Sequence, residues 1–128
     1  LDCLAGVSFD VMIPVPLHAK DLRARGFNQS ELLCRHLSRA TGLIYQNALI
    51  KIKKTRKQSS LGHEQREDNV KDAYICIYPL YKKRILMVDD VRTTGCTAQA
   101  CAAELLKAGA REVSLLTATV AANTTSKH

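Results

Sequence analysis

The 128-residue chain contains no tryptophan, and aromatic residues make up only 5% of it. An extended surface for single-stranded nucleic acid stacks bases on aromatic side chains, so this scarcity counts against one. No apolar run approaches the roughly 20 residues that a membrane-spanning helix needs, and no secretory signal pattern opens the chain. With an ordinary hydrophobic fraction of 46%, residues 1–128 are expected to form a single globular domain.

Cysteine is present, but not in a pattern that binds zinc or builds a disulfide framework. The chain has an odd number of cysteines and no C-x-x-C pair: Cys3, Cys34, Cys76, Cys96 and Cys101. Reduced thiols, and therefore a cytoplasmic protein, are the plainest interpretation. Cys34 and Cys101 fall on expected helices, where free cysteine behaves as a small apolar side chain. The four histidines show no metal-ligand spacing either.

Strand-like and helix-like segments alternate along the chain. Strands are expected at residues 9–15, 48–53, 73–78, 85–89 and 113–120. One helix is expected to begin after an Asn28 N-cap, with Glu31 completing a capping box, and to end near Gly42. A second is expected at residues 97–108, with an inner side formed by Ala100, Ala103, Leu105 and Leu106. Such alternation predicts an α/β fold with a mostly parallel sheet flanked by helices.

Two polar segments remain between these elements. Residues 17–27 are expected to be a basic loop, and residues 54–69 a long charged loop that is either functional or mobile. In parallel sheets, ligands bind at the carboxyl ends of strands. These two loops and the one after Asp89 are therefore candidates for a shared edge. The net charge of +7 suits a phosphate-rich ligand there and also suits nucleic acid.

Residues 85–97 carry the most specific pattern in the chain. Four apolar residues run into Asp89 and Asp90, and Thr93-Thr94-Gly95-Cys96-Thr97 follows where a helix is expected to begin. The apolar run suits a buried parallel strand. Hydroxyls and backbone N–H groups at a helix start suit a phosphate, and the carboxylates can accept hydrogen bonds from sugar hydroxyls. Together they describe a pocket for a ribose 5-phosphate.

The acidic pair has two simpler interpretations. It can be a solvated turn that caps the next helix, or part of an acidic pocket like that of response regulators. The second needs further carboxylates at an earlier strand end, and the strand that ends at Pro14 supplies none. The agreement of strand, acids, turn and helix favours the sugar-phosphate interpretation.

This pattern resembles the phosphoribosyl-pyrophosphate (PRPP) motif of type I phosphoribosyltransferases. It departs at Arg92, where the motif usually carries an aliphatic residue. A narrower resemblance is to the competence protein F (ComF) family, which includes predicted amidophosphoribosyltransferases. It rests on Val15-Pro16-Leu17, Arg25-Gly26-Phe27-Asn28-Gln29-Ser30, Lys51, Lys53, Thr55, Gln58, Leu61, Arg66 and Asn69. Members usually carry an N-terminal cysteine-rich, zinc-ribbon-like segment. Because this chain begins at Leu1, after that segment, it is expected to be a fragment.

The resemblance implies a type I phosphoribosyltransferase fold and transfer of ribose 5-phosphate from PRPP to an unidentified nucleophile, with release of pyrophosphate. It implies that Asp89 and Asp90 hold the ribose hydroxyls, and that Mg²⁺ binds through the substrate with no direct protein ligand. It implies a phosphate site formed by Val91, Arg92, Thr93, Thr94, Gly95, Cys96 and Thr97. It implies a pyrophosphate loop and a closing flap that include Arg23, Arg25, Gly26, Asn28, Lys54, Arg56, Gln58 and Arg66.

Other functions remain open. The domain can be a PRPP or nucleotide sensor, an accessory protein that contacts DNA or the competence machinery, or an inactive scaffold. A pure DNA-binding module has no use for Asp89 and Asp90 on a basic face, whereas a sensor would keep them. A nucleotide-salvage setting, the acceptor and the oligomeric state are equally open, with a dimer as one plausible form.

Overall fold

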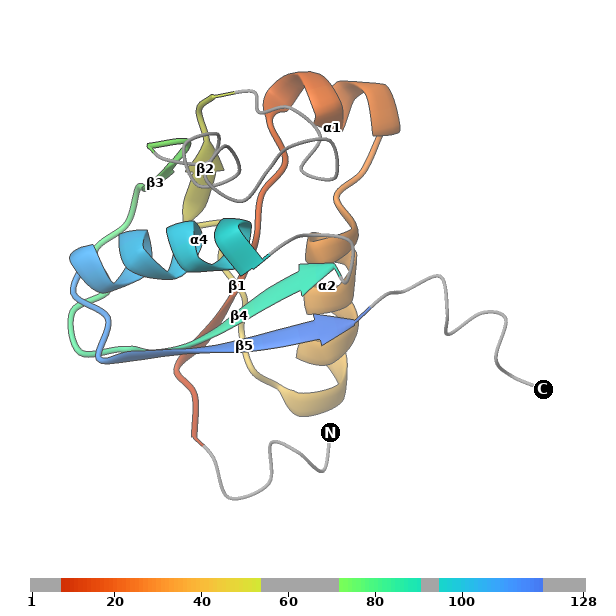
Figure 1. Cartoon of the computed structure of the whole chain (residues 1–128). Helices are drawn as coiled ribbons and strands as arrows, with labels where there is room; N and C mark the ends of the chain where they lie inside the picture. The colour runs from red at the N-terminus through yellow and green to blue at the C-terminus, as the bar shows by residue number, and fades with distance from the viewer. Residues whose placement is uncertain (1–7, 54–71, 91–94, 119–128) are drawn as a thin grey trace.

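The computed structural model describes residues 8–53, 72–90 and 95–118 (Figure 1). The elements follow in the order β1 (Val11–Pro14), α1 (Ala19–Arg25), α2 (Gln29–Thr41), β2 (Leu49–Lys51), β3 (Tyr74–Cys76), β4 (Arg84–Asp90), α4 (Gly95–Lys107) and β5 (Glu112–Ala118). Within these ranges, no helix has both the length and the apolar character needed to cross a membrane.

The main sheet has three parallel strands in the order β1-β4-β5. Ile13 pairs with Met87 across β1 and β4, and β4 pairs with β5 along its whole length. This confirms the predicted α/β fold with a parallel sheet. Strands β2 and β3 lie apart from it, as an antiparallel pair in which Ile50 is opposite Ile75. The sequence pattern did not distinguish this pair from the strands of the parallel sheet.

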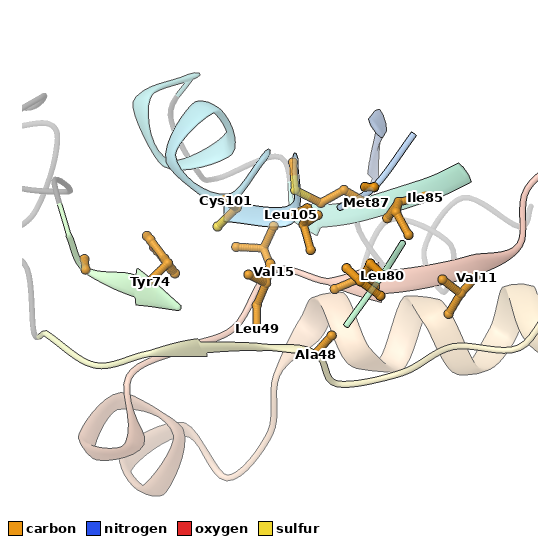
Figure 2. Packing of buried hydrophobic residues seen from close by; sticks show 13 residues of the cluster. Val11, Val15, Ala48, Leu49, Tyr74, Leu80, Ile85, Met87, Cys101 and Leu105 are labelled. Carbon is orange, nitrogen blue, oxygen red and sulfur yellow. The ribbon is translucent and has the colours of Figure 1, made fainter. Parts of the chain in front are cut away.

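The central strand β4 is buried on both faces by different helices. Ile85 and Met87 pack in one cluster with Cys101 and Leu105 of α4 (Figure 2). Leu86 and Val88 point to the opposite face and pack in a second cluster with Leu33 and Cys34 of α2. The period of two along a strand explains why β4 reads as a continuous apolar run.

This arrangement creates a topological switch point between β1 and β4. Residue Met12 of β1 pairs with Leu86 of β4 on one side and bridges Tyr45 on the other. The chain therefore leaves β1 through α2 toward one edge of the sheet, and later returns to the other side of β1 as β4. The connections after β1 and β4 diverge, and α/β sheets bind ligands in the crevice that such a divergence opens.

Helix α1 corrects the prediction that residues 17–27 are a basic loop. The side chain of His18 accepts a hydrogen bond from the Lys20 N–H at 3.1 Å, and Gly26 ends the helix with φ of 85°. A positive φ favours glycine, which has no Cβ. No residue of α1 is buried. The prediction was wrong because it looked for an apolar stripe, and this helix has only local start and stop signals.

Helix α2 begins and ends where the sequence predicted. Asn28 is its N-cap, and Gly42 ends it with φ of 78°. Glu31, however, does not complete a capping box: its carboxylate contacts Asn47 and Arg35 instead. Cys34 is fully buried, and burial, with a smaller contribution from Glu31, raises the pKa of its thiol to about 12. The thiol stays protonated and packs as the expected apolar filler.

The inner side of α4 agrees only in part with the predicted one. Thr97, Cys101 and Leu105 are buried, whereas Ala103 and Leu106 are exposed. Residues four apart lie on one face of a helix, and the buried set follows that spacing. The prediction was right for Leu105 and for Ala100, which is partly buried against the core, and wrong for Ala103 and Leu106. The apolar residues of this helix occur all around it and do not specify which face packs.

Candidate functional site

Two carboxylates stand at the carboxyl end of the central strand. Asp89 is 1% exposed and Asp90 is 7% exposed, although aspartate is rarely buried. Because successive side chains of a strand alternate, Asp89 continues the face of Met87 toward α4, and Asp90 continues the face of Val88 toward α2. The Asp89 side chain also accepts a hydrogen bond from the backbone N–H of Asp90 at 2.8 Å. The pair therefore spans both sides of the strand end.

A recess opens beside this pair at the switch point. Its empty volume is about 350 Å³, part of it open to solvent. Its lining comes from the segment after β1, the α1–α2 junction and the end of β4: Val15, Pro16, Leu17, Arg25, Asn28, Gln29, Ser30, Asp89 and Asp90. Of the three loops expected at the carboxyl edge, the segment that follows β1 therefore meets the end of β4. Residues 91–94 of the loop after Asp89, and residues 54–69, lie outside the described residues.

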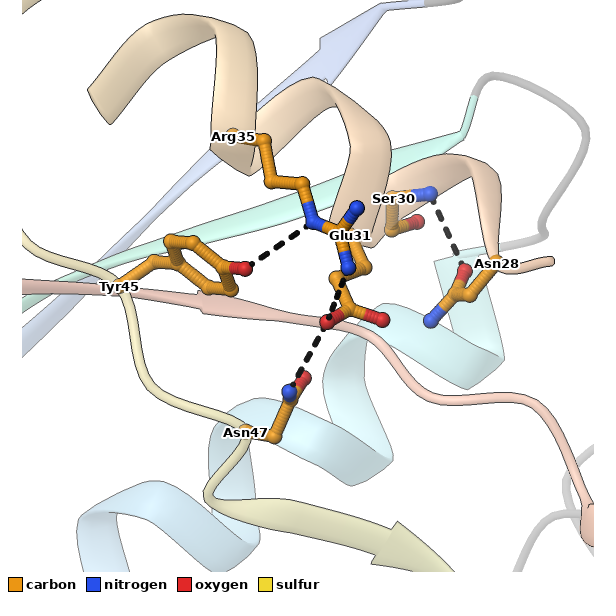
Figure 3. Close-up of polar contacts among 6 residues, drawn as sticks. All are labelled: Asn28, Ser30, Glu31, Arg35, Tyr45 and Asn47. Atoms are coloured by element: carbon orange, nitrogen blue, oxygen red, sulfur yellow. Dashed lines mark hydrogen bonds and ion pairs between the residues drawn. The ribbon is translucent and has the colours of Figure 1, made fainter. Parts of the chain in front are cut away.

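Asn28 holds this junction together. Its Nδ2 donates to the carbonyl of Val15 at 3.1 Å, and its Oδ1 accepts from the N–H of Ser30 at 3.1 Å. Figure 3 shows the second of these contacts at the start of α2. Both ends of the amide thus brace the segment after β1 against α2, so Asn28 orients the lining of the recess.

A second set of polar contacts joins α2 to the segment that contains Tyr45 and lies beside β1. Glu31 accepts from Nδ2 of Asn47 at 3.2 Å and lies 3.7 Å from the guanidinium of Arg35. Arg35 in turn donates from Nε to the hydroxyl of Tyr45 at 3.2 Å (Figure 3). Tyr45 bridges β1, so these contacts fix the helix start relative to the sheet.

The expected pyrophosphate residues separate into two groups. Arg25 and Asn28 line the recess with the acidic pair. Arg23 is exposed on α1 and Gly26 ends that helix, and neither lines the recess. The expected flap residues lie outside the described part of the chain: Lys54, Arg56, Gln58 and Arg66.

The expected phosphate site is described only in part. Its first four residues, Val91, Arg92, Thr93 and Thr94, lie outside the described residues, and α4 begins at Gly95, close behind Asp90. Thr97 is 6% exposed and hydrogen-bonds with Tyr74 of β3. This hydroxyl therefore ties the first turn of α4 to the antiparallel pair.

Tyr74 is the centre of a buried polar cluster that sequence reasoning missed. Burial raises the pKa of its hydroxyl, the neighbouring Cys101 and Asp89 raise it further, and the bond to Thr97 lowers it. The Nζ of Lys51 lies 5.7 Å from the centre of the Tyr74 ring, and burial lowers the pKa of that ammonium. No local signal separates Tyr74 from an ordinary strand tyrosine. Its role follows from the packing of β3 on α4.

The oxygen donors at the end of β4 are the carboxylates of Asp89 and Asp90. The described residues contain no group of three histidine, cysteine, aspartate or glutamate side chains that could hold a metal ion. Carboxylates such as Asp89 and Asp90 suit a hard cation such as Mg²⁺, which keeps several non-protein oxygen ligands. The donor set therefore fits a cation that brings most of its ligands with it.

Comparison with known proteins finds relatives named for DNA utilization and for competence. No family model matches it. It is 37% identical over 105 residues to the DNA utilization protein YhgH of Escherichia coli K12, with 81% of this chain and 46% of that protein covered. The corresponding protein of Salmonella typhi is 36% identical over the same shares. Competence protein F of Haemophilus influenzae is 34% identical over 108 residues, covering 81% and 47%. The chain thus spans about half the length of the curated relatives it matches.

A solved structure supports the fold. The model matches the structure of the allosteric regulatory enzyme of purine biosynthesis, a phosphoribosyltransferase, with a TM-score of 0.52 and 24% identity over 88% of this chain and 22% of that one. At this identity the match shows the fold alone. Both resemblances stated from the sequence are confirmed: the chain is a relative of competence protein F and of the YhgH proteins, and it has a phosphoribosyltransferase fold.

Proposed function

We propose that the recess binds PRPP with Mg²⁺, and that the domain transfers ribose 5-phosphate to a nucleophile and releases pyrophosphate. One observation carries this proposal: Asp89 and Asp90 are both buried at the end of the central parallel strand and line a recess at the topological switch point. Buried carboxylates in such a crevice suit a ligand with neighbouring hydroxyl donors.

Each part of the recess has a chemical role in this proposal. The carboxylates of Asp89 and Asp90 accept hydrogen bonds from the ribose 2′ and 3′ hydroxyls and offset the positive charge that develops on the ring. Arg25 binds the departing pyrophosphate through charge-assisted hydrogen bonds. The bond from ribose C1 to pyrophosphate breaks with its electron pair on the leaving group, and the nucleophile bonds to C1 and loses a proton.

Mg²⁺ would reach the site bound to the substrate. Asp89 and Asp90 would contact it through the sugar hydroxyls rather than enclose it. When bound, the cation neutralises charge on the pyrophosphate leaving group. The residues of this chain do the rest: they orient the sugar and hold the anion.

The names of the relatives extend the proposal to a setting in competence and DNA uptake. They also support a second candidate, an accessory protein that binds DNA or senses PRPP without turnover. Helix α1 favours this candidate, because Lys20, Arg23 and Arg25 are exposed on a helix without buried residues. Contacts of this kind bind phosphate backbones and weaken steeply with added salt.

The deciding experiment is a calorimetric titration of the domain with PRPP, with and without Mg²⁺, followed by an assay for pyrophosphate release with candidate amines. Mg²⁺-dependent binding with acceptor-dependent release is the expected result. Binding without release favours the sensor. Absence of binding, together with salt-sensitive affinity for DNA, overturns the transferase proposal.

A further inference from the structure

Gln29, the first residue of α2, presents an unusual group beside the recess. It lines the recess with Asp89 and Asp90. Its Oε1 is a buried side-chain oxygen without a hydrogen-bond partner among the described residues. Nearly all buried polar atoms in proteins have a partner, and leaving one without costs stability. An orphaned acceptor at the wall of a recess therefore needs an explanation.

The neighbouring groups do not need this oxygen. The amide of Asn28 already donates to the carbonyl of Val15 and accepts from the backbone N–H of Ser30. The Gln29 carboxamide oxygen is thus a buried group of this turn with capacity left to accept a hydrogen bond. Its terminal torsion is broad and soft, so the carboxamide can turn its oxygen toward the recess without movement of the helix.

We propose that Gln29 is a specificity-determining residue whose carboxamide oxygen accepts a hydrogen bond from a ribose hydroxyl of the ligand held by Asp89 and Asp90. This inference rests on the proposed function. The ionised phosphates of PRPP only accept hydrogen bonds, so its ribose hydroxyls are the donors that this oxygen meets. A site with a buried acceptor selects ligands that carry the matching donor, because an analogue without it leaves the acceptor unpaired.

The proposal predicts opposite effects on stability and on binding. Gln29→Met keeps the length and the helix propensity of the side chain but removes its hydrogen-bonding atoms. Without ligand, the variant should melt about 3 °C higher, because the orphaned acceptor is gone. Its affinity for Mg²⁺·PRPP should fall about tenfold. Gln46→Met is the matched control, since Gln46 is also partly buried but does not line the recess. The control should bind as the wild type does.

Differential scanning calorimetry and titration calorimetry decide between the outcomes. A Gln29→Met variant that melts at or below the wild-type temperature overturns the inference, because its oxygen is then satisfied in solution. A higher melting temperature with unchanged affinity for Mg²⁺·PRPP also overturns it. A wild-type domain that binds neither PRPP nor ribose 5-phosphate removes the proposed function and this inference together. That failure is recognisable because it precedes any substitution.

Discussion

Helices α1 and α2 follow one another and have the same kinds of cap at both ends, yet only α2 packs against the sheet. Each begins at a side chain that accepts from the N–H two residues on, and each ends at a glycine with positive φ. Helix α2 buries Leu33 and Cys34 against the sheet, whereas α1 buries nothing. Leu22, the large apolar residue of α1, is 40% exposed, and Leu33 is 6% exposed.

The two helices differ in whether they are part of the hydrophobic core: α2 packs in it, and α1 lies outside it. Local capping groups define where both helices start and stop, but only an apolar stripe makes a helix part of the core. Helix α2 therefore fixes the wall of the recess, and α1 places the guanidinium-bearing Arg25 in its lining. A helix that gives stability and a helix that gives charge should respond differently to substitution.

The largest expected effect is on stability. Leu33→Ala should lower the free energy of unfolding by about 3 kcal/mol, through lost burial and the cavity left behind. Leu22→Ala should change it by less than about 0.5 kcal/mol, because Leu22 is an exposed residue of a helix that buries none of its side chains. Urea denaturation of both variants measures the contrast. Equal losses would mean that α1 packs in solution and that the comparison fails.

The next effect is on binding, at the recess between the two helices. Asp90→Asn should weaken Mg²⁺·PRPP binding about tenfold or more, because hydrogen bonds to a charged group are the stronger ones. Asp10→Asn makes the same change at the amino end of the sheet, where Asp10 accepts from the Arg84 N–H at 2.7 Å. Titration calorimetry should show a loss for Asp90→Asn alone. Unchanged affinity would remove Asp90 from the site.

A smaller effect on stability is expected at the first turn of α4, where Thr97 is buried as Ser30 is in the first turn of α2. Tyr74→Phe removes the bond to Thr97 but keeps the ring beneath Lys51. Stability should fall by about 1 kcal/mol, and Mg²⁺·PRPP affinity should fall with it if Thr97 positions the start of α4. Tyr81→Phe is the control, since Tyr81 is 74% exposed. Thermal melts and titrations of both variants provide the test, and full binding by Tyr74→Phe would assign Tyr74 to packing alone.

The smallest effect should be found on α1. Arg25→Gln should weaken Mg²⁺·PRPP binding about threefold, with less effect as salt rises, because exposed charges are screened. Arg39→Gln places the same change in the last turn of α2, away from the recess, and should leave binding unchanged. Neither should alter the melting temperature measurably. Equal weakening by both would point to general charge rather than a built site.

The features of the structure that the sequence predicts are those that depend on residues close together in the chain. The apolar run of β4, its terminal Asp89 and Asp90, and the Asn28 cap are all encoded by neighbours in the chain, and each lies where it was predicted. Helix α1 was missed because its charged sequence resembles a loop, although its caps are local. The inner face of α4 was assigned correctly only for Ala100 and Leu105, because alanine, cysteine and leucine occur all around this helix.

By itself, the sequence determined the order of the strands and of helices α2 and α4, the acidic end of the central strand and the boundaries of α2, because each depends on propensities and hydrogen bonds within a few residues. Only the tertiary structure decided that β2 and β3 pair apart from the parallel sheet. It also decided that Arg25, Asn28 and Gln29 share a recess with Asp90, and that Tyr74 reaches Thr97. These contacts join segments far apart in the chain, and they form because the two faces of β4 must each be covered by a helix. That requirement places the connections after β1 and β4 on opposite sides of the sheet and opens the recess between them.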